Sequence, residues 1–201
     1  MTQVRKGPLR GPFFLTGALL GKLSSIALCL AAPTSLAEQS YDVVFDSGDD
    51  ALRIATLSVT SLDEDNGYTL TFNEELFGDY FLSMRPFRCI AHTGRMLCHL
   101  PYPYENRRRL GRDGLTDLEY DLLFIARSPT EYGINPWNGR YFHLRWEGDA
   151  IRGEMHETDL DVLAAPPEHD NLRPLADVDM VRMERSDGQW VPGLSILPQQ
   201  P

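Results

Sequence analysis

Short runs of alternating apolar and polar residues recur along the chain and are separated by turn-forming residues, a pattern that predicts β-strands. Asn66-Gly67 predicts a tight hairpin turn, because both central residues of such a turn adopt positive φ. A further break is expected near Pro86, inside a long strand. The strands predicted in this way cover residues 41–46, 51–62, 68–72, 79–92, 95–102, 141–146, 151–156 and 177–184.

The clearest hairpin joins two strictly alternating runs, 141–146 and 151–156, through a turn at Gly148-Asp149. Nearly every second side chain in these runs is apolar, so one face of the hairpin is predicted to join the core. The same register places Tyr141 opposite His156 on the other face.

Residues 115–127 fit two patterns. Thr116-Asp117-Leu118-Glu119 has the form of a helix capping box, and the apolar residues that follow keep helical spacing. Alternate residues from Leu118 to Phe124 are apolar or aromatic as well, which is the strand pattern. The segment is therefore predicted to begin as a helical turn and to continue as a strand.

Strands joined by local turns predict a mainly β domain: an antiparallel meander that forms a small barrel or sandwich, with at most one or two short helices. The size is lipocalin-like. The Gly-x-Trp motif of lipocalins is missing near the first strand, so the comparison is one of size alone.

The first 37 residues have the composition of a cleavable secretory signal. They carry four basic residues and no acid, an apolar run over 23–32, and small residues in Ser35-Leu36-Ala37. An apolar run of about 10 residues is too short to span a bilayer. We therefore predict cleavage after Ala37, a periplasmic or secreted location, and no membrane attachment of the mature chain. The predicted domains are the signal (1–37), a β-rich domain (38–186) and a loose, proline-rich C-terminal tail (187–201).

Cys89 and Cys98 are the cysteines that remain after the predicted cleavage. They flank Thr93-Gly94, a two-residue hairpin loop, at positions that face each other across a non-hydrogen-bonded pair. An even cysteine count in an exported protein favours a disulfide. The bridge is predicted to point into the core, on the same face as Phe87 and Met96.

The charge balance narrows the range of partners. The chain has 19 basic and 29 acidic residues, and removal of the four bases of the signal leaves 15 against 29, a net charge near −14. Such a surface repels nucleic acid and anionic lipid, so neither is expected as a partner.

Long loops predict the candidate site, since long loops in compact domains are commonly functional. Two of them, 128–139 and 158–176, are expected at the same end of the β structure. Aromatic and polar residues there predict stacking and hydrogen bonding to a ligand. The predicted ligand-binding residues are Tyr132, Asn135, Trp137, Tyr141, His156 and Asp159. The alternative interpretation places Tyr132 and Trp137 in the core as a plug.

Motifs for catalysis, metals or cofactors are absent from the sequence, so neither a metal nor a cofactor is predicted. Carboxylates considered as an acid–base pair are Glu119, Asp121 and Glu131. Asp63-Glu64-Asp65 and the acids between 157 and 161 are candidate cation sites, and Arg107-Arg108-Arg109 is a candidate anion site. The leading hypothesis is an exported domain that binds a small molecule or a partner. The alternatives are a periplasmic hydrolase and an envelope assembly protein.

Overall fold

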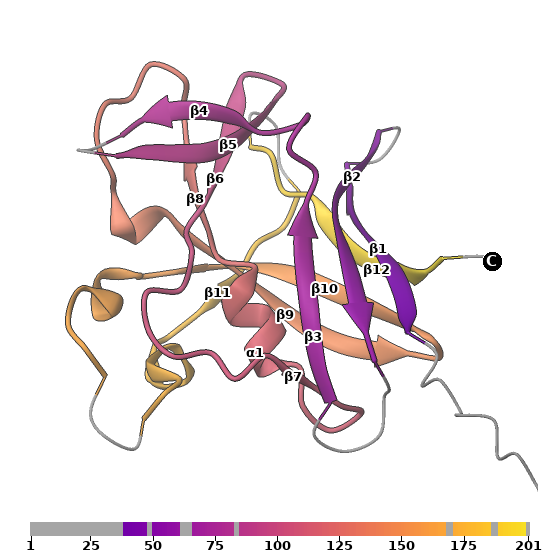
Figure 1. Ribbon diagram of the computed structural model, residues 1–201. Helices are drawn as coiled ribbons and strands as arrows, with labels where there is room; N and C mark the ends of the chain where they lie inside the picture. The colour runs from indigo at the N-terminus through magenta and orange to yellow at the C-terminus, as the bar shows by residue number, and fades with distance from the viewer. Residues whose placement is uncertain are drawn as a thin grey trace, which may run out of the picture. The chain divides into compact units, whose positions relative to one another are not determined.

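In the part of the chain that the computed structural model describes, twelve β-strands form one antiparallel sheet (Figure 1). The structure describes residues 38–47, 50–60, 66–82, 85–167, 171–185 and 189–199, so the predicted signal and Asp63-Glu64-Asp65 lie outside the described residues. The described residues belong to one unit, 35–201. The elements are β1 (Gln39–Asp46), β2 (Ala51–Val59), β3 (Asn66–Phe72), β4 (Gly78–Phe81), β5 (Pro86–His92), β6 (Arg95–His99), β7 (Arg109–Leu110), α1 (Thr116–Asp121), β8 (Phe124–Arg127), η1 (Pro136–Asn138), β9 (Gly139–Glu147), β10 (Ala150–Thr158), η2 (Asp161–Ala164), η3 (Pro174–Asp177), β11 (Val181–Arg182) and β12 (Gly193–Pro198).

Two meanders make up the sheet, and one strand joins them. The strand order is β4-β5-β6-β8-β9-β10-β12-β1-β2-β3-β7, with β11 paired to β10. The C-terminal strand β12 lies between β10 of the second meander and β1 of the first, as the yellow and indigo ribbons of Figure 1 show. The mainly β class with few short helices is confirmed. The sheet is not closed, because β4 and β7 stand at the two ends of the order.

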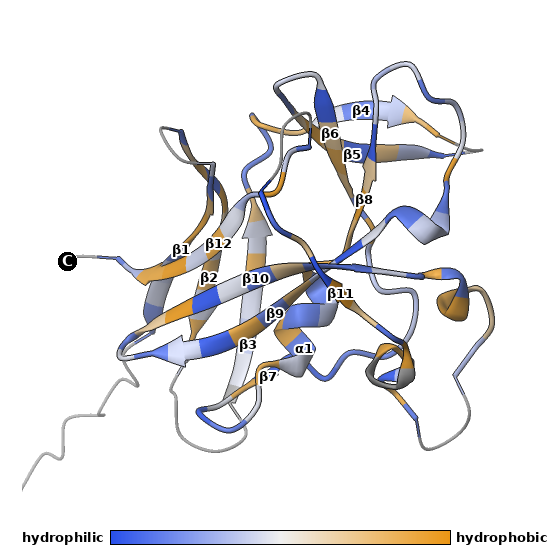
Figure 2. Ribbon diagram, turned by 180° about the vertical axis from the view of Figure 1, so that it is seen from behind, coloured by the Kyte–Doolittle hydropathy of each residue, from blue (hydrophilic) through white to orange (hydrophobic). Residues whose placement is uncertain are grey.

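The predicted loose tail is wrong for the residues that the structure describes. Leu194 and Ile196 of β12 are buried in the main core, beside the apolar stripes of β1 and β10 (Figure 2). The prolines do not interrupt the pairing, because Pro192 precedes the strand and Pro198 ends it. Gly153 of β10 permits the close approach, since a Cβ there would lie 2.9 Å from the Cβ of Leu194. Of the strand predicted over 177–184, only β11 is observed among the described residues, and its two residues pair with β10.

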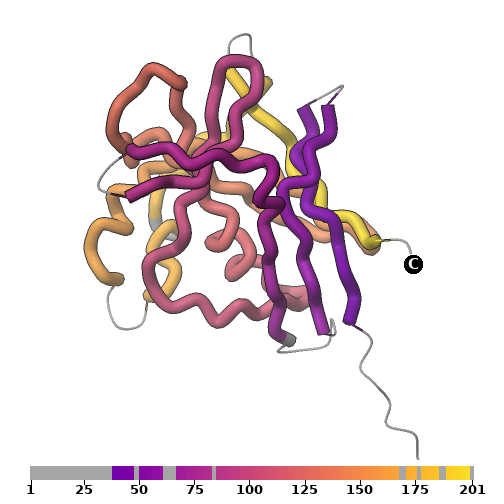
Figure 3. Tube along the Cα trace, turned by 45° about the horizontal axis from the view of Figure 1, so that its top comes forward, coloured from indigo at the N-terminus to yellow at the C-terminus, as the bar shows by residue number. Residues whose placement is uncertain are grey.

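Two turn predictions also need correction. Asn66 and Gly67 are not the tips of a tight hairpin, because Val59 pairs with Tyr68 and residues 66 and 67 already pair with β7. The break near Pro86 is a complete reversal: β4 and β5 form a hairpin of their own, running side by side in the tube of Figure 3. A proline that opens β5 therefore marks an edge hairpin rather than a bent strand.

Both hairpins with explicit registers are confirmed. Tyr141 pairs with His156 across β9 and β10, and Cys89 pairs with Cys98 across β5 and β6. The disulfide between the two cysteines is present. As predicted, the bridge is buried on the same face as Phe87 and Met96, and together they form a small hydrophobic cluster beside the main core. The opposite face of β5 and β6 joins the main core.

Replacement of both Cys89 and Cys98 by alanine is expected to lower the free energy of unfolding by about 2–3 kcal/mol, because the unfolded chain regains the entropy of a short closed loop. Chemical denaturation of the double variant and the wild type under non-reducing conditions measures the difference. An unchanged midpoint would show that the bridge does not stabilise the native state.

The helix-to-strand transition predicted for residues 115–127 is confirmed as α1 followed by β8. The capping box is not formed, since the N-cap is Leu115 and has no side-chain cap. Asp117 instead accepts a hydrogen bond from the backbone N–H of Arg109, and Glu119 reaches β9. Among the described residues, the helices are all too short or too polar to cross a bilayer.

Candidate ligand-binding pocket

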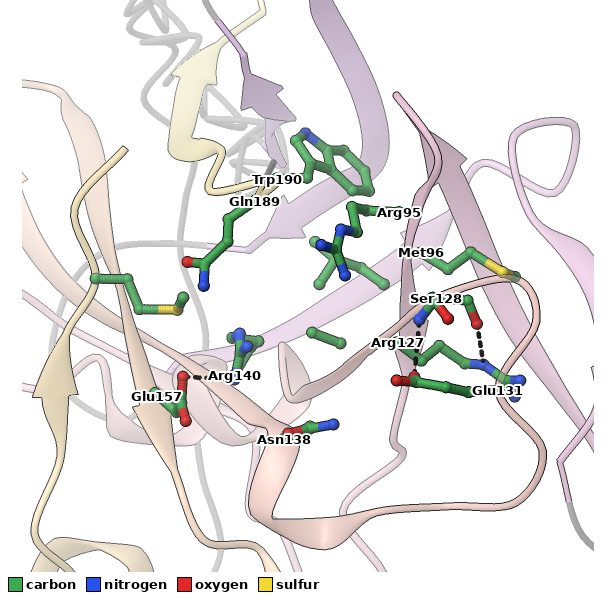
Figure 4. Close-up of a pocket in the computed structure, with 13 residues that line it drawn as sticks. Arg95, Met96, Arg127, Ser128, Glu131, Asn138, Arg140, Glu157, Gln189 and Trp190 are labelled. Atoms are coloured by element: carbon green, nitrogen blue, oxygen red, sulfur yellow. Dashed lines mark hydrogen bonds and ion pairs between the residues drawn. The ribbon is translucent and has the colours of Figure 1, made fainter. Parts of the chain in front are cut away.

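A pocket of about 270 Å³ lies where the main core meets the ends of β6, β8, β9 and β10 (Figure 4). Met183, Gln189 and Trp190 complete its wall. Leu97 and Ala126, a cross-strand pair of β6 and β8, contribute apolar surface. The pocket therefore lies at the edge of the main core, on the face of the sheet that packs against that core.

The alternation of the strands explains why arginines line this rim. Side chains two residues apart share a face of a strand. Arg95 shares its face with Leu97, which belongs to the main core, and Arg140 precedes the core residue Phe142 by two positions. Figure 4 shows the ends of Arg95, Arg140 and Gln189 around one space.

Arg140 is buried, with 8% of its surface exposed. Its Nη1 donates to the carbonyl oxygen of Gly139 at 2.9 Å and lies 3.5 Å from a carboxylate oxygen of Glu157, its cross-strand partner. Burial lowers the pKa of Arg140, and the charge of Glu157 opposes that shift. A guanidinium stays protonated in proteins, so a cation with five donors faces the pocket.

Arg127 and Glu131 form another side of the pocket. Arg127 is 9% exposed, its Nε donates to the carbonyl of Ser128 at 3.2 Å, and its buried Nη1 has no hydrogen-bond partner within the described part of the chain. Glu131 accepts a hydrogen bond from the backbone N–H of Ser128 at 2.8 Å. The loop that begins at Ser128 is thus held against the strand end by its own side chains.

Three predicted site residues lie on the loop before β9 or within η1. Tyr132 and Trp137 are 94% and 66% exposed, so they do not plug the core. Asn135 accepts a hydrogen bond from the backbone N–H of Trp137 at 3.1 Å and caps η1. The same loop supplies Asn138 to the pocket.

The other three predicted residues have partners of their own. Tyr141 is buried and donates to a carboxylate oxygen of Glu119, and burial, followed by that charge, raises its pKa. His156 is half-buried opposite Tyr141. Asp159 accepts a hydrogen bond from the backbone N–H of Asp161 at 2.8 Å. The structure thus brings Tyr141 and His156 together, while the pocket is lined by other residues than the six predicted.

The residues predicted for the site and the residues that line the pocket differ by one position along β9 and by one position along β10. Arg140 and Glu157, which line the pocket, are the immediate neighbours of Tyr141 and His156 and form the next pair of the same ladder. Successive side chains of a strand point to opposite faces, so a shift of one residue exchanges the two faces. The sequence contains one indication of this pair: Arg140 precedes Phe142, the first apolar residue on the core-facing side of β9, by two positions and so shares its face.

Two of the remaining candidates, Asp121 and Arg108, contact each other within the fold. Asp121 accepts hydrogen bonds from the hydroxyl of Tyr68, the amide of Asn106 and Nε of Arg108, at 2.9–3.0 Å. This network uses one arginine of the 107–109 run as an internal partner. Groups of three or more metal-binding side chains are absent from the described residues.

Comparisons with protein-family models, with curated protein sequences and with solved structures find no match to this chain.

Proposed function

We propose that this protein binds a small acidic molecule in the pocket, through the guanidinium groups of Arg95 and Arg140. The observation that carries the proposal is the convergence of these two cations beside apolar surface, in a chain whose net charge is −10. Among the described residues, the carbonyl of Gly139 and the carboxylate of Glu157 do not use all five donors of buried Arg140. A carboxylate or phosphate ligand supplies the missing acceptors, and arginine binds both groups with two parallel hydrogen bonds.

The size and lining of the pocket restrict the ligand. A volume of about 270 Å³ is below the roughly 300–1,000 Å³ typical of pockets for drug-sized molecules. Leu97, Met183 and Trp190 offer apolar contacts, and Asn138 and Gln189 offer amide groups. These features favour a compact organic acid with an apolar portion over a bare inorganic anion.

The binding test uses acetate, succinate, benzoate and inorganic phosphate as probes, with the intrinsic tryptophan fluorescence and the thermal midpoint as readouts. Arg140→Met is expected to weaken binding of the best probe by roughly 10- to 100-fold, because a hydrogen bond to a charged group contributes about 1.5–3 kcal/mol. Arg53→Met is the matched control, since Arg53 is an exposed arginine of β2 outside the pocket.

Two results would contradict the proposal: none of the acidic probes binds to the wild type, or Arg140→Met binds the best probe as tightly as the wild type does. Native mass spectrometry of protein purified from its own host complements the panel, because it identifies a ligand that co-purifies.

The proposed place of action is outside the cytoplasm, in the periplasm or the medium. The signal-like composition of residues 1–37 supports it, and so does the disulfide, because cytoplasmic thiols are normally kept reduced. Cleavage after Ala37 leaves β1 intact. Sequencing of the mature N-terminus is expected to begin at Glu38, whereas full-length protein in the host cytoplasm would refute export.

A further inference from the structure

Two histidines lie side by side on the face of the β9–β10 hairpin that is turned away from the pocket. The ring centroids of His143 and His156 are 6.1 Å apart. They are diagonal neighbours in the ladder, because His143 pairs with Glu154 and His156 pairs with Tyr141. A motif search predicts no metal site here, since the pairing of two strands, rather than spacing along one helix, brings the two rings together.

The contacts of the two rings determine which nitrogen is available. Nδ1 of His156 lies 3.1 Å from the carbonyl oxygen of Glu154, and Nδ1 of His143 lies 3.3 Å from a carboxylate oxygen of Glu119. A carbonyl and a carboxylate only accept hydrogen bonds, so these two contacts favour the tautomer with the proton on Nδ1. In that tautomer the lone pair of each ring is on Nε2.

This is the arrangement in which histidines bind metals: one ring nitrogen donates to a carboxylate or a backbone carbonyl, and the other nitrogen binds the ion. We propose that His143 and His156 form a site for a divalent transition-metal ion, with both Nε2 atoms as ligands. Imidazole suits Cu²⁺ and Zn²⁺, and Cu²⁺ is bound more tightly by a given set of nitrogen ligands. Ca²⁺ and Mg²⁺ require oxygen ligands and are not expected.

Protein side chains supply two ligands, and solvent completes the coordination. Glu154 stands opposite His143, but its carboxylate is engaged by Arg145 at 2.9 Å and by Arg182 at 3.2 Å. The side chain of His143 is 70% exposed, so an ion reaches the site without any opening of the fold.

Glu119 is the positioning residue of this site. Its side chain is buried and is held by the backbone N–H of Leu144 at 2.7 Å and by the hydroxyl of Tyr141. The carboxylate that faces Nδ1 of His143 is thus fixed from two sides. The metal site stands apart from the proposed acid pocket, which is lined by Arg140 and Glu157 on the opposite face.

The test is a titration of untagged protein with CuCl₂, followed by calorimetry and by electron paramagnetic resonance. We expect one ion per chain, with hyperfine coupling to two imidazole nitrogens. His143→Gln and His156→Gln are each expected to lose the two-nitrogen spectrum, whereas the control His92→Gln, at a half-buried histidine of β5, retains it. Glu119→Gln is expected to weaken binding by roughly 10- to 100-fold while the two-nitrogen spectrum persists.

Circular dichroism establishes that the variants fold, and the exposure of His143 makes its replacement mild. The proposal is wrong if the wild type binds no Cu²⁺, or if both His143→Gln and His156→Gln bind it like the wild type. It is equally wrong if His92→Gln removes the two-nitrogen spectrum.

Discussion

Removal of residues 186–201 is expected to leave a chain that does not fold. The deletion takes away β12, which pairs with β10 on one side and β1 on the other and joins the two meanders. It also removes Trp190, Leu194 and Ile196 from the main core. The loss of this burial and of two ladders exceeds the about 5–15 kcal/mol by which domains are stable. Far-UV circular dichroism and thermal unfolding measure the outcome.

Two point variants distinguish the contribution of the side chains of β12 from the effect of shortening the chain. Ile196→Ala is expected to cost about 2–5 kcal/mol, because it leaves a cavity at a fully buried position. Leu197→Ala, on the exposed side of the same strand, is expected to change stability by less than about 0.5 kcal/mol. A truncated chain that unfolds cooperatively at the wild-type midpoint would restore the interpretation of these residues as a loose tail.

Glu119→Ala is expected to lower the free energy of unfolding by about 3–5 kcal/mol. The pairing of β8 with β9 ends at Arg140. Further along β9, the backbone N–H of Leu144 donates its hydrogen bond to the carboxylate of Glu119 in α1 instead of to a neighbouring strand. The same carboxylate accepts from the hydroxyl of buried Tyr141. Removal of the carboxylate leaves two buried donors without an acceptor, each at a cost of about 1–3 kcal/mol, and adds a cavity. Urea denaturation of variant and wild type measures the change.

The matched variants are Glu119→Gln, which keeps an acceptor oxygen and is expected to cost less, and Thr116→Ala at an exposed position of the same helix. This comparison also bears on the hydrolase hypothesis, in which Glu119 was a candidate acid or base. Removal of a carboxylate retained for catalysis alone commonly leaves stability unchanged or raises it. A Glu119→Ala protein at least as stable as the wild type would therefore favour that hypothesis over a structural role.

The sequence alone was sufficient for features that depend on neighbours along the chain. The β9–β10 hairpin, the Cys89–Cys98 bridge and the change from α1 to β8 were predicted from alternation and turn residues within about a dozen positions of each other. A hairpin register follows from its turn, because the loop length fixes which residues face each other.

Tertiary structure decided the features that depend on distant segments. Nothing local to residues 193–198 indicates that β12 enters the sheet between β1 and β10, since its partners lie about 150 and 40 residues away in the chain, a separation that carries no periodic signal. The lining of the pocket also depends on segments that are distant in the chain. Which face of β9 and β10 borders an open space depends on where β6, β8 and the side chains of Met183, Gln189 and Trp190 lie, and all of these lie outside the β9–β10 hairpin. Local sequence sets the alternation of a strand, whereas the position of the other layers decides which of its two faces binds a ligand.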